Sequence, residues 1–347
     1  MMKEIKCIVW DLDNTIWHGI LLEDKNVRLK EGITDIFKTL DSRGILHSIS
    51  SKNHYDLAFA KLEEFGLSEY FLYPEINWNN KSASIKNISK NLNIGFDTIL
   101  FIDDQEYERD EVKYNFPGVH CIDAAEYETL LDKPALNPRF ITEDSKRRRK
   151  MYVEDINRKR DEENYAGPEE EFLKLLQMQL KIKKAGEDDF RRLEELTVRT
   201  HQLNTTGYSY NYNELKELLH SDNHILLTAE LTDVYGSYGK IGLVLIKNIN
   251  DEWRIKLFIL SCRVMNRGIG TVLLNEIINS AASQSKKLSA EFFHTDRNRI
   301  MYVTLKFANF IEAGEDVNNG PVLLRNDLSV INPNPPYINL ISEKKWN

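Results

Sequence analysis

Short apolar runs alternate with amphipathic, helix-like segments along the first part of the chain. Apolar runs typical of buried strands lie at 5–10, 45–49, 98–102 and 119–122, and helical periodicity lies at 33–40, 55–65 and 82–92. Strands that alternate with helices build a parallel sheet with helices on both faces, and ligands gather at the carboxyl ends of its strands. We therefore predict an α/β fold with its functional residues at that edge of the sheet.

The pattern changes after the segment PALNPRF, which contains two prolines. Residues 139–180 are charged and helical, with a break at Ala166, Gly167 and Pro168, so we predict a helical linker there. Strands and helices alternate again afterwards, with apolar runs at 225–230, 241–247, 253–260 and 287–293. We predict an N-terminal domain at 1–138, the linker at 139–180 and a second α/β domain at 181–347. The basic run at 146–150 is expected to be a solvated helix face, with a docking face for an acidic partner as the alternative.

Composition narrows the choice of partners and compartment. The formal net charge is -8 and the pI is about 5.6, whereas general nucleic-acid binding needs an excess of Lys and Arg. No apolar run approaches the length of a membrane span, and the start of the chain runs directly into a strand. We expect a cytoplasmic protein that binds neither nucleic acid nor membrane. Of the three cysteines, Cys7 and Cys121 fall in predicted buried strands, which leaves Cys262 for thiol chemistry.

Two carboxylates follow the first predicted strand, in the stretch IVWDLDNTIW. Asp11 and Asp13 are too close together for two free charges without a cation or a shared proton. A Mg²⁺ ion resolves this, because Asp11 and the backbone carbonyl of Asp13 can ligate it while an oxygen of Asp11 attacks phosphorus. Asp13 then suits acid–base catalysis.

Matching groups end the later strands. Ser51 can offer a hydroxyl and a backbone N–H to phosphate oxygens, Lys81 a fixed positive charge, and Asp103 with Asp104 two further metal ligands. Singly, each has an ordinary alternative as a loop residue, a solvated lysine or a helix cap. Together they form one ordered set, which resembles the four motifs of the haloacid-dehalogenase-like (HAD) phosphotransferases. Thr15 of the D-x-D-x-T motif and Asn53 of the stretch SKN join the phosphate-binding candidates.

The stretches between these motifs are short. Neither the segment from Thr15 to Ser51 nor the segment from Ser51 to Lys81 has room for a folded cap domain beyond the predicted helices and strands. We therefore predict an open, capless site. An open site favours a substrate that a macromolecule presents or that a second domain encloses.

The stretch FILSCRVMNRGIGTVLL joins a strand, a glycine turn and a helix. Gly268 and Gly270 can bring bare N–H groups and the positive end of a helix dipole to one point, where a pyrophosphate can bind, although many such turns need glycine only for positive φ. Cys262 precedes the turn, near Arg263 and Arg267, whose charges favour a thiolate. We favour a nucleophilic Cys262 over a structural cysteine at a strand end.

The strand, turn and helix resemble the acyl-CoA-binding core of the Gcn5-related N-acetyltransferases (GNAT). Met265 stands where those enzymes usually carry Gln or Arg, and Lys306 with Phe307 replaces their later aromatic-Gly-Phe signature. A phosphopantetheine arm on a carrier protein suits such a cleft, because it lacks the adenosine pyrophosphate that the complete loop binds.

The whole chain resembles the FkbH-like proteins, which are HAD-type glyceryl transferases and phosphatases. The further motifs that carry this resemblance are Asn77 and Trp78, Glu108 and Arg109, the helix residues Thr142, Glu143, Asp144, Arg148, Met151 and Tyr152, the stretch 199–204, LSCRV at 260–264, and Thr295 with Asn298. The resemblance implies that a small acyl phosphate, such as 1,3-bisphosphoglycerate, gives its acyl group to Cys262 as a thioester. The HAD site removes the other phosphate with Mg²⁺, and the glyceryl group passes to an acyl carrier protein.

The resemblance also yields a set of acyl- or pantetheine-binding candidates, namely His201, Gln202, Asn204, Arg263, Arg267, Gly268, Gly270, His294 and Asn298. His201 and His294 are possible bases, although a single histidine is more often structural. Two other functions stay open. One is a plain magnesium phosphatase whose second domain is a docking module, and the other is an N-acyltransferase of sugar or polysaccharide biosynthesis whose N-terminal domain is degenerate.

Overall fold

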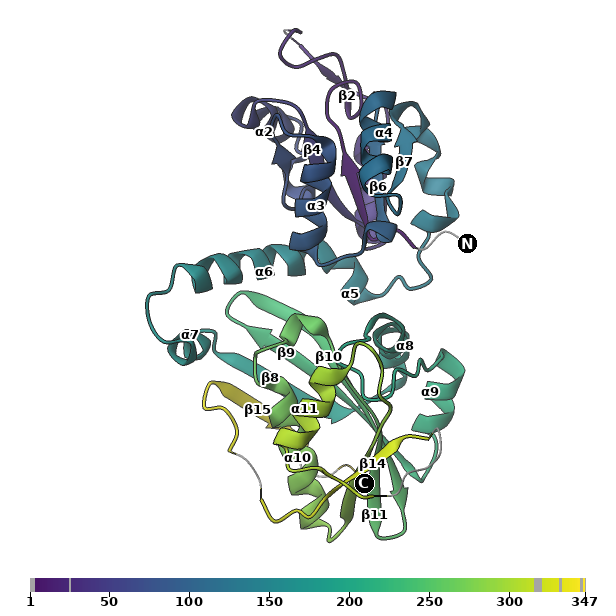
Figure 1. Ribbon diagram of the computed structural model, residues 1–347, viewed down its shortest axis with the longest axis vertical. Coiled ribbons are helices and arrows are strands. Elements are labelled where there is room, and N and C mark those ends of the chain that lie inside the picture. The colour runs from purple at the N-terminus through teal and green to yellow at the C-terminus, as the bar shows by residue number, and fades with distance from the viewer. Residues whose placement is uncertain (1–3, 25, 315–319, 331–332, 344–345, 347) are drawn as a thin grey trace. The chain divides into compact units, whose positions relative to one another are not determined.

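The computed structural model describes residues 4–24, 26–314, 320–330, 333–343 and 346 (Figure 1). The chain forms two compact units, Met1–Val153 and Glu154–Asn347, which divide inside the segment predicted as the linker. Each unit has its own sheet and its own hydrophobic core.

The N-terminal unit is built on a parallel sheet of five strands. In spatial order these are β5 (Glu75–Ile76), β4 (Leu46–Ser51), β1 (Cys7–Trp10), β6 (Ile99–Asp103) and β7 (His120–Asp123). Every neighbouring pair is parallel, so all carboxyl ends lie at one edge. The predicted parallel α/β fold is confirmed. Cys121 is only half-buried, contrary to its expected burial, because β7 is an edge strand.

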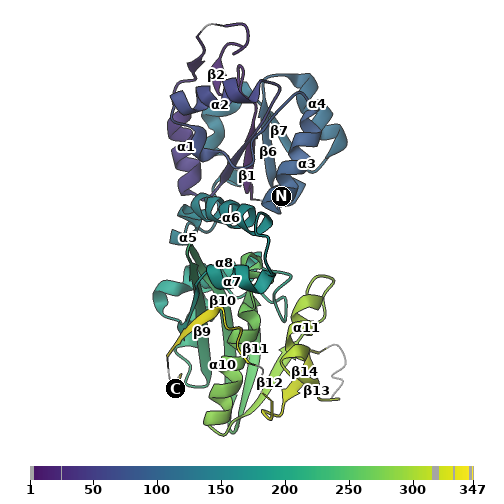
Figure 2. The same ribbon diagram turned by 90° about the vertical axis from the view of Figure 1, so that its left-hand side faces the viewer.

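Four helices connect these strands: α1 (Ile33–Ser42), α2 (Tyr55–Glu64), α3 (Lys81–Leu92) and α4 (Glu106–Asn115). Figure 2 shows α1 on one side of the sheet and α3 and α4 on the other. Helix α1 buries Ile33, Ile36, Phe37 and Leu40, an i, i+3, i+4, i+7 stripe that faces the sheet. Short 3-10 turns complete the unit at Ser68–Tyr70, Phe96–Thr98, Ala124–Asp132 and Pro134–Leu136.

A small hairpin is inserted between β1 and α1. Its strands β2 (Trp17–His18) and β3 (Arg28–Leu29) are two residues each, and the Trp17 side chain is completely buried. Between Ser51 and Lys81 the described chain forms only α2, one short turn and β5. The segments that could have carried a cap domain are therefore filled by these small elements, as the sequence predicted.

The linker segment forms three helices, α5 (Glu143–Lys146), α6 (Arg148–Glu163) and α7 (Glu169–Leu175), with the predicted break before α7. The basic run at 146–150 is solvated only in part: Lys146, Arg147 and Lys150 are exposed as expected, whereas Arg148 and Arg149 are half-buried. The Arg149 guanidinium donates to both carboxylate oxygens of Asp41 at 3.0 and 3.2 Å and to Glu69 at 3.1 Å. Arg148 donates to the backbone oxygen of Gly44 at 2.6 Å. These arginines attach the beginning of α6 to the N-terminal unit.

The second unit contains a mixed sheet of eight strands. In spatial order these are β13 (Ile311–Glu312), β14 (Val322–Asn326), β12 (Lys287–Phe292), β11 (Glu252–Leu260), β10 (Gly236–Ile249), β9 (His224–Asp233), β8 (Met178–Lys184) and β15 (Ile338–Ser342). Strands β11 and β12 are parallel, as are β8 and β15, and the other neighbours are antiparallel. The predicted second α/β fold is confirmed. Strand β8 begins within the segment expected to be helical.

Helices cover both faces of this sheet, and the strands alternate accordingly. Along β10, Leu243 and Leu245 pack beneath α8 (Phe190–Arg199) and α9 (Tyr212–Leu219), whereas Val244 and Ile246 pack into the larger cluster with α10 (Ile269–Ser283) and α11 (Arg299–Phe307). This two-residue alternation is what a strand buried on both faces requires. Among the described residues, we find no helix with the length and apolar character that crossing a bilayer would need.

Candidate active site

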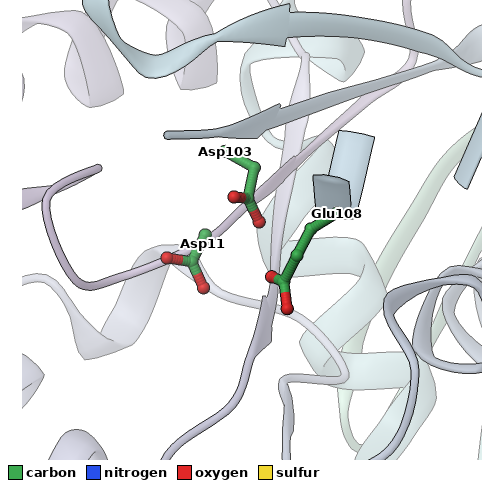
Figure 3. A group of neighbouring side chains, drawn as sticks. All are labelled: Asp11, Asp103 and Glu108. Atoms are coloured by element: carbon green, nitrogen blue, oxygen red, sulfur yellow. The ribbon is translucent and has the colours of Figure 1, made fainter. Parts of the chain in front are cut away.

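Three carboxylates converge at the carboxyl edge of the parallel sheet. Asp11 follows the central strand β1, Asp103 ends β6, and Glu108 lies one turn into α4. One oxygen from each lies within 4.8 Å of the others (Figure 3). All three residues are buried, at 6%, 0% and 6% exposure. The parallel topology brings these side chains together because neighbouring strands end at the same edge.

Lys81, the first residue of α3, balances part of the negative charge of this cluster. Its ammonium lies 2.5 Å from Asp11 Oδ1, 2.9 Å from Asp103 Oδ2 and 2.9 Å from Glu108 Oε2, and it donates to the backbone oxygen of Ser50 at 2.8 Å. Burial alone would lower the pKa of Lys81, but the three carboxylates outweigh it and raise the pKa. Lys81 is therefore a fixed positive charge at the position where the sequence predicted one.

The carboxylate of Asp13 accepts hydrogen bonds from three donors. Its Oδ1 accepts hydrogen bonds from Trp17 Nε1 at 2.8 Å and Leu21 N at 3.0 Å, and its Oδ2 accepts from Asn53 Nδ2 at 3.1 Å. Burial raises the pKa of Asp13, and the hydrogen bonds from Leu21 and Trp17 offset part of the increase. A carboxyl group with a raised pKa can carry the proton that a leaving alkoxide needs. The β2–β3 hairpin supplies two of the donors that fix it.

The two acids that end β6 have different environments. Burial and the charge of Asp11 raise the pKa of Asp103, against the influence of Lys81. The backbone N–H of Gln105 donates to its Oδ1 at 2.8 Å. Asp104 is half-buried, and burial followed by the charge of Asp11 raises its pKa. Both groups thus experience an excess of negative charge that a bound cation would relieve.

The predicted phosphate-binding residues lie at the same edge. Ser51 and Asn53 are 3% and 1% exposed, and the backbone oxygen of Ser51 accepts from Asn77 N at 3.0 Å. Thr15 is 1% exposed, and its hydroxyl is buried without a hydrogen-bond partner in the described part of the chain. The Asn53 amide is already bonded to Asp13, so it positions that carboxylate.

The donor set fits a magnesium ion. Mg²⁺ prefers oxygen ligands, and Asp11, Asp103 and Glu108 supply carboxylate oxygens close enough to share one cation. Asp103 Oδ2 is buried and accepts no aligned hydrogen bond, although Lys81 Nζ is near it. The carboxylate of Asp104 is not part of this group, and metal ligation by Asp104 and by the backbone carbonyl of Asp13 stays a prediction.

Sequence reasoning assigned no role to Glu108. The structure buries this side chain between two lysines, Lys52 and Lys81, and interaction with Lys81 contributes to lowering its pKa despite the opposing effect of burial. The neighbouring Arg109 donates to the Asp103 backbone oxygen at 2.7 Å and pairs with Asp123 at 2.8 Å. The sequence signal that could have identified Glu108 is the pair Glu108–Arg109, which follows Asp103 and Asp104 by about one helical turn.

Cys262 lies at the end of β11, in a 3-10 turn at Cys262–Val264. The thiol is half-buried, and its Sγ lies 3.9 Å from Gln202 Oε1. The structure thus brings together the predicted nucleophile, Cys262, and one predicted acyl-binding residue, Gln202. Arg263 donates through Nε to Ser261 Oγ at 3.3 Å, on the same turn.

The glycine turn is covered by the chain's own C-terminal segment. Gly268 begins α10 with φ 73°, and a Cβ placed on it would lie 3.0 Å from Pro335 Cγ and 3.1 Å from Tyr337 Oη. Arg267 is 9% exposed and donates to both carboxylate oxygens of Glu162 at 3.2 and 2.9 Å. A pyrophosphate at this turn would have to compete with Glu162 for Arg267. Gly270 needs no positive φ, and a side chain there would press on Leu260 and Thr304.

The remaining candidates divide into buried and exposed residues. Asn298 Nδ2 donates to the backbone oxygens of Asn204 at 3.0 Å and Phe293 at 2.8 Å, and Asn204 Oδ1 accepts from the N–H groups of residues 206 and 207. These two amides fix the loops beside β11. His294 is exposed and packs against the rings of Phe292 and Tyr302, whereas His201 is exposed on its loop. Their predicted contacts with an acyl group stay predictions.

No protein-family model matches the chain, and no curated protein sequence matches it. The N-terminal region is similar to the N-terminal part of protein BF1531 from Bacteroides fragilis, whose crystal structure contains a phosphatase domain complexed with Mg. The identity is 32% and the TM-score 0.35, over 39% of this chain and 40% of that chain. The match therefore spans less than half of that structure.

The C-terminal region is similar to solved N-acetyltransferases. The ribosomal-protein-S18-alanine N-acetyltransferase of Escherichia coli matches at 14% identity and a TM-score of 0.32, over 42% of this chain and 90% of that chain. The spermidine N-acetyltransferase of Vibrio cholerae, solved with CoA and spermine, matches at 19% identity and a TM-score of 0.32, over 42% and 93% of the two chains.

Proposed function

We propose that this protein is an enzyme with two sites, a magnesium-dependent phosphatase site in the N-terminal unit and an acyl-transfer site in the second unit. The observation that carries the first site is the convergence of Asp11, Asp103 and Lys81 at the carboxyl edge of the parallel sheet. A nucleophile, a metal ligand and a fixed cation are the groups that phosphoryl transfer needs in one place.

In the phosphatase reaction, an oxygen of Asp11 attacks phosphorus, and the phosphorus–oxygen bond to the leaving group breaks. Asp13 donates a proton to the leaving alkoxide and then takes a proton from the water that hydrolyses the aspartyl phosphate. The positions of Trp17, Leu21 and Asn53 support this role, because they fix the Asp13 carboxyl group. Lys81 balances charge on the transferred phosphoryl group. Bound Mg²⁺ would supply Lewis-acid stabilisation of that charge, held by Asp11 and Asp103 with Glu108 adjacent.

For the second unit we propose that the Cys262 thiolate attacks the carbonyl carbon of a small acyl phosphate. A carbon–sulfur bond forms, the carbon–oxygen bond breaks and inorganic phosphate leaves. The thiolate of a carrier-protein pantetheine arm then takes the acyl group from the thioester and releases Cys262. The partial exposure of this thiol supports access by such a substrate. The acyl group is proposed to be of the glyceryl type and the acceptor an acyl carrier protein.

The experiment that tests the phosphatase site is Asp11→Asn in the full-length protein with Mg²⁺. The amide cannot act as a carboxylate nucleophile, so phosphate release should disappear while the circular dichroism spectrum stays that of the wild type. Near wild-type release from the folded variant would exclude Asp11 as the nucleophile.

The acyl-transfer site is tested by intact-protein mass spectrometry. Incubation with 1,3-bisphosphoglycerate and no carrier should add one glyceryl or phosphoglyceryl mass that hydroxylamine removes, and Cys262→Ser should lose this adduct. An adduct that persists in Cys262→Ser would instead favour the second candidate function. In that alternative the second unit is a docking module for a plain phosphatase, which the covered turn at Gly268 and the pairing of Arg267 with Glu162 also favour.

A further inference from the structure

Glu108 is the one buried carboxylate of the cluster that bridges two lysines. Its Oε2 lies 2.9 Å from Lys81 Nζ inside the site, and its Oε1 lies 2.8 Å from Lys52 Nζ at the rim. The Glu108 side chain is 7% exposed, whereas that of Lys52 is 33% exposed. One carboxylate thus holds an inner and an outer ammonium group in a fixed relation.

Lys52 keeps donors for a ligand in this arrangement. An ammonium group has three N–H donors, and the contact with Glu108 uses one of them. Lys52 follows Ser51, a predicted phosphate-binding residue, and it lines a shallow surface hollow with Asn80, Tyr107 and Glu111. The Tyr107 ring lies 5.9 Å from its ammonium and is itself 70% exposed. Lys81 and Glu108 line the same hollow, so Lys52 is exposed at an opening that reaches these two residues of the site.

The charges of the two lysines have different surroundings. Lys81 is shared among three carboxylates, so it serves the inner cluster. In the described part of the chain, Lys52 pairs with one carboxylate, that of Glu108, and its side chain reaches solvent. An anionic group on the substrate, next to the phosphoryl group, would meet Lys52 first.

We propose that Lys52 is a specificity determinant that selects phosphate esters bearing a second anionic group, a carboxylate or another phosphate, and that Glu108 is the positioning residue that holds it. This inference rests on the proposed phosphatase function of the same site. The substrate class is thus a small phosphorylated acid, with the reacting phosphoryl group at Lys81 and the second anion at Lys52.

The test compares two esters of similar shape, phosphoglycolate and ethyl phosphate, which differ by a carboxylate in place of a methyl group. With full-length protein and Mg²⁺, wild type should show a higher kcat/KM for phosphoglycolate. Lys52→Met should lower the ratio of the two kcat/KM values about fivefold, the factor expected from one partly exposed ion pair. Lys90→Met, at the exposed other end of α3, removes the same charge and should leave the ratio unchanged. An unchanged ratio in Lys52→Met would overturn the proposal.

Glu108→Gln tests the positioning role. The amide oxygen can accept from one lysine but cannot pair ionically with both, so the ratio should fall as in Lys52→Met, and kcat should fall for both esters because Lys81 is also released. A lower kcat with an unchanged ratio would separate Glu108 from Lys52 and contradict this part of the inference.

Calorimetry on Asp11→Asn distinguishes failure of the proposed phosphatase function from failure of the inference about Lys52. If wild type hydrolyses neither ester, the phosphatase function is excluded. Binding of phosphoglycolate to Asp11→Asn with Mg²⁺ still decides the role of Lys52. If Asp11→Asn binds phosphoglycolate more tightly than ethyl phosphate, and the Asp11→Asn, Lys52→Met double variant loses this preference, the role of Lys52 is supported. Equal binding of both esters to Asp11→Asn excludes the role.

Discussion

Replacing Lys81 by Met should strongly destabilise the N-terminal unit when no divalent metal is present. The apolar stem keeps a similar length, so the substitution removes mainly the ammonium and its contacts with Asp11, Asp103 and Glu108. Its side chain is 2% exposed, so water cannot replace these contacts. Breaking a buried ion pair by removing one partner typically costs about 3–5 kcal/mol. We expect a loss of that size at pH 7 in EDTA.

The loss should shrink as the pH falls. Burial already raises the pKa of Asp103 in the folded state, with Asp11 adding to the increase and Lys81 opposing it. Without Lys81 the pKa rises further. A carboxyl group with a raised folded-state pKa destabilises the fold fully above that pKa, and this cost declines as the pH falls below it towards the unfolded-state pKa. Between pH 7.5 and 5.5 the difference in unfolding free energy between wild type and variant should therefore decrease. Excess Mg²⁺ should restore part of the stability at pH 7.

The assay is urea unfolding at several pH values, followed by hydrogen–deuterium exchange of peptides from β1 and β6. Exchange assigns the change to the N-terminal unit in a chain that has two units. A loss below about 1 kcal/mol at pH 7 would contradict the buried-charge argument. A difference that grows on acidification would contradict the assignment of the cost to ionised carboxylates.

Three further predictions concern the turn, the linker helix and the thiols. Gly268→Ala should lower the unfolding free energy by about 1–2 kcal/mol more than Gly32→Ala does. Both glycines cap helix N-termini at φ near 70°, but Gly268 has Pro335 and Tyr337 next to the Cβ position whereas Gly32 has no neighbour there. Equal losses would contradict a turn covered by Pro335 and Tyr337. Urea unfolding should show that Arg149→Met lowers the unfolding free energy by about 1–2 kcal/mol, because Arg149 binds Asp41 and Glu69. The control Lys150→Met, at an exposed neighbouring position, should lower it by less than about 0.5 kcal/mol. Iodoacetamide should label Cys262 far faster than Cys7, whose pKa burial raises, and equal labelling by peptide mass spectrometry would contradict the exposure of Cys262.

The amino-acid sequence by itself determined the repeating elements and the place of the chemistry. Apolar runs at 5–10 and 98–102 became β1 and β6, because residues buried on both faces leave little alternative to a central strand. Parallel strands end at one edge, so the positions of Asp11 and Asp103 in the sequence were sufficient to predict that they meet. The break before α7 followed from local glycine and proline geometry.

The two strands at one end of the second sheet, β8 and β15, gave weaker local signals. Strand β8 alternates buried and exposed residues over Met178–Lys184, yet it follows a charged helical segment directly, and its assignment depends on pairing with β9 and β15. Strand β15 pairs with residues far earlier in the chain. Periodicity within a window contains no information about such distant partners.

The tertiary structure alone decided which charged side chains form ion pairs within the protein. Three charged residues on helices or turns look alike in the sequence, but each pairs with a residue far away in the chain. Glu108 pairs with Lys52 and Lys81, Arg149 with Asp41, and Arg267 with Glu162. The Gly268 turn has a sequence typical of an anion site, but Pro335 and Tyr337 cover it. The physical reason is that a charge or a bare N–H group is stabilised by whatever lies within a few ångströms of it, and chain folding, rather than local sequence, sets that neighbourhood.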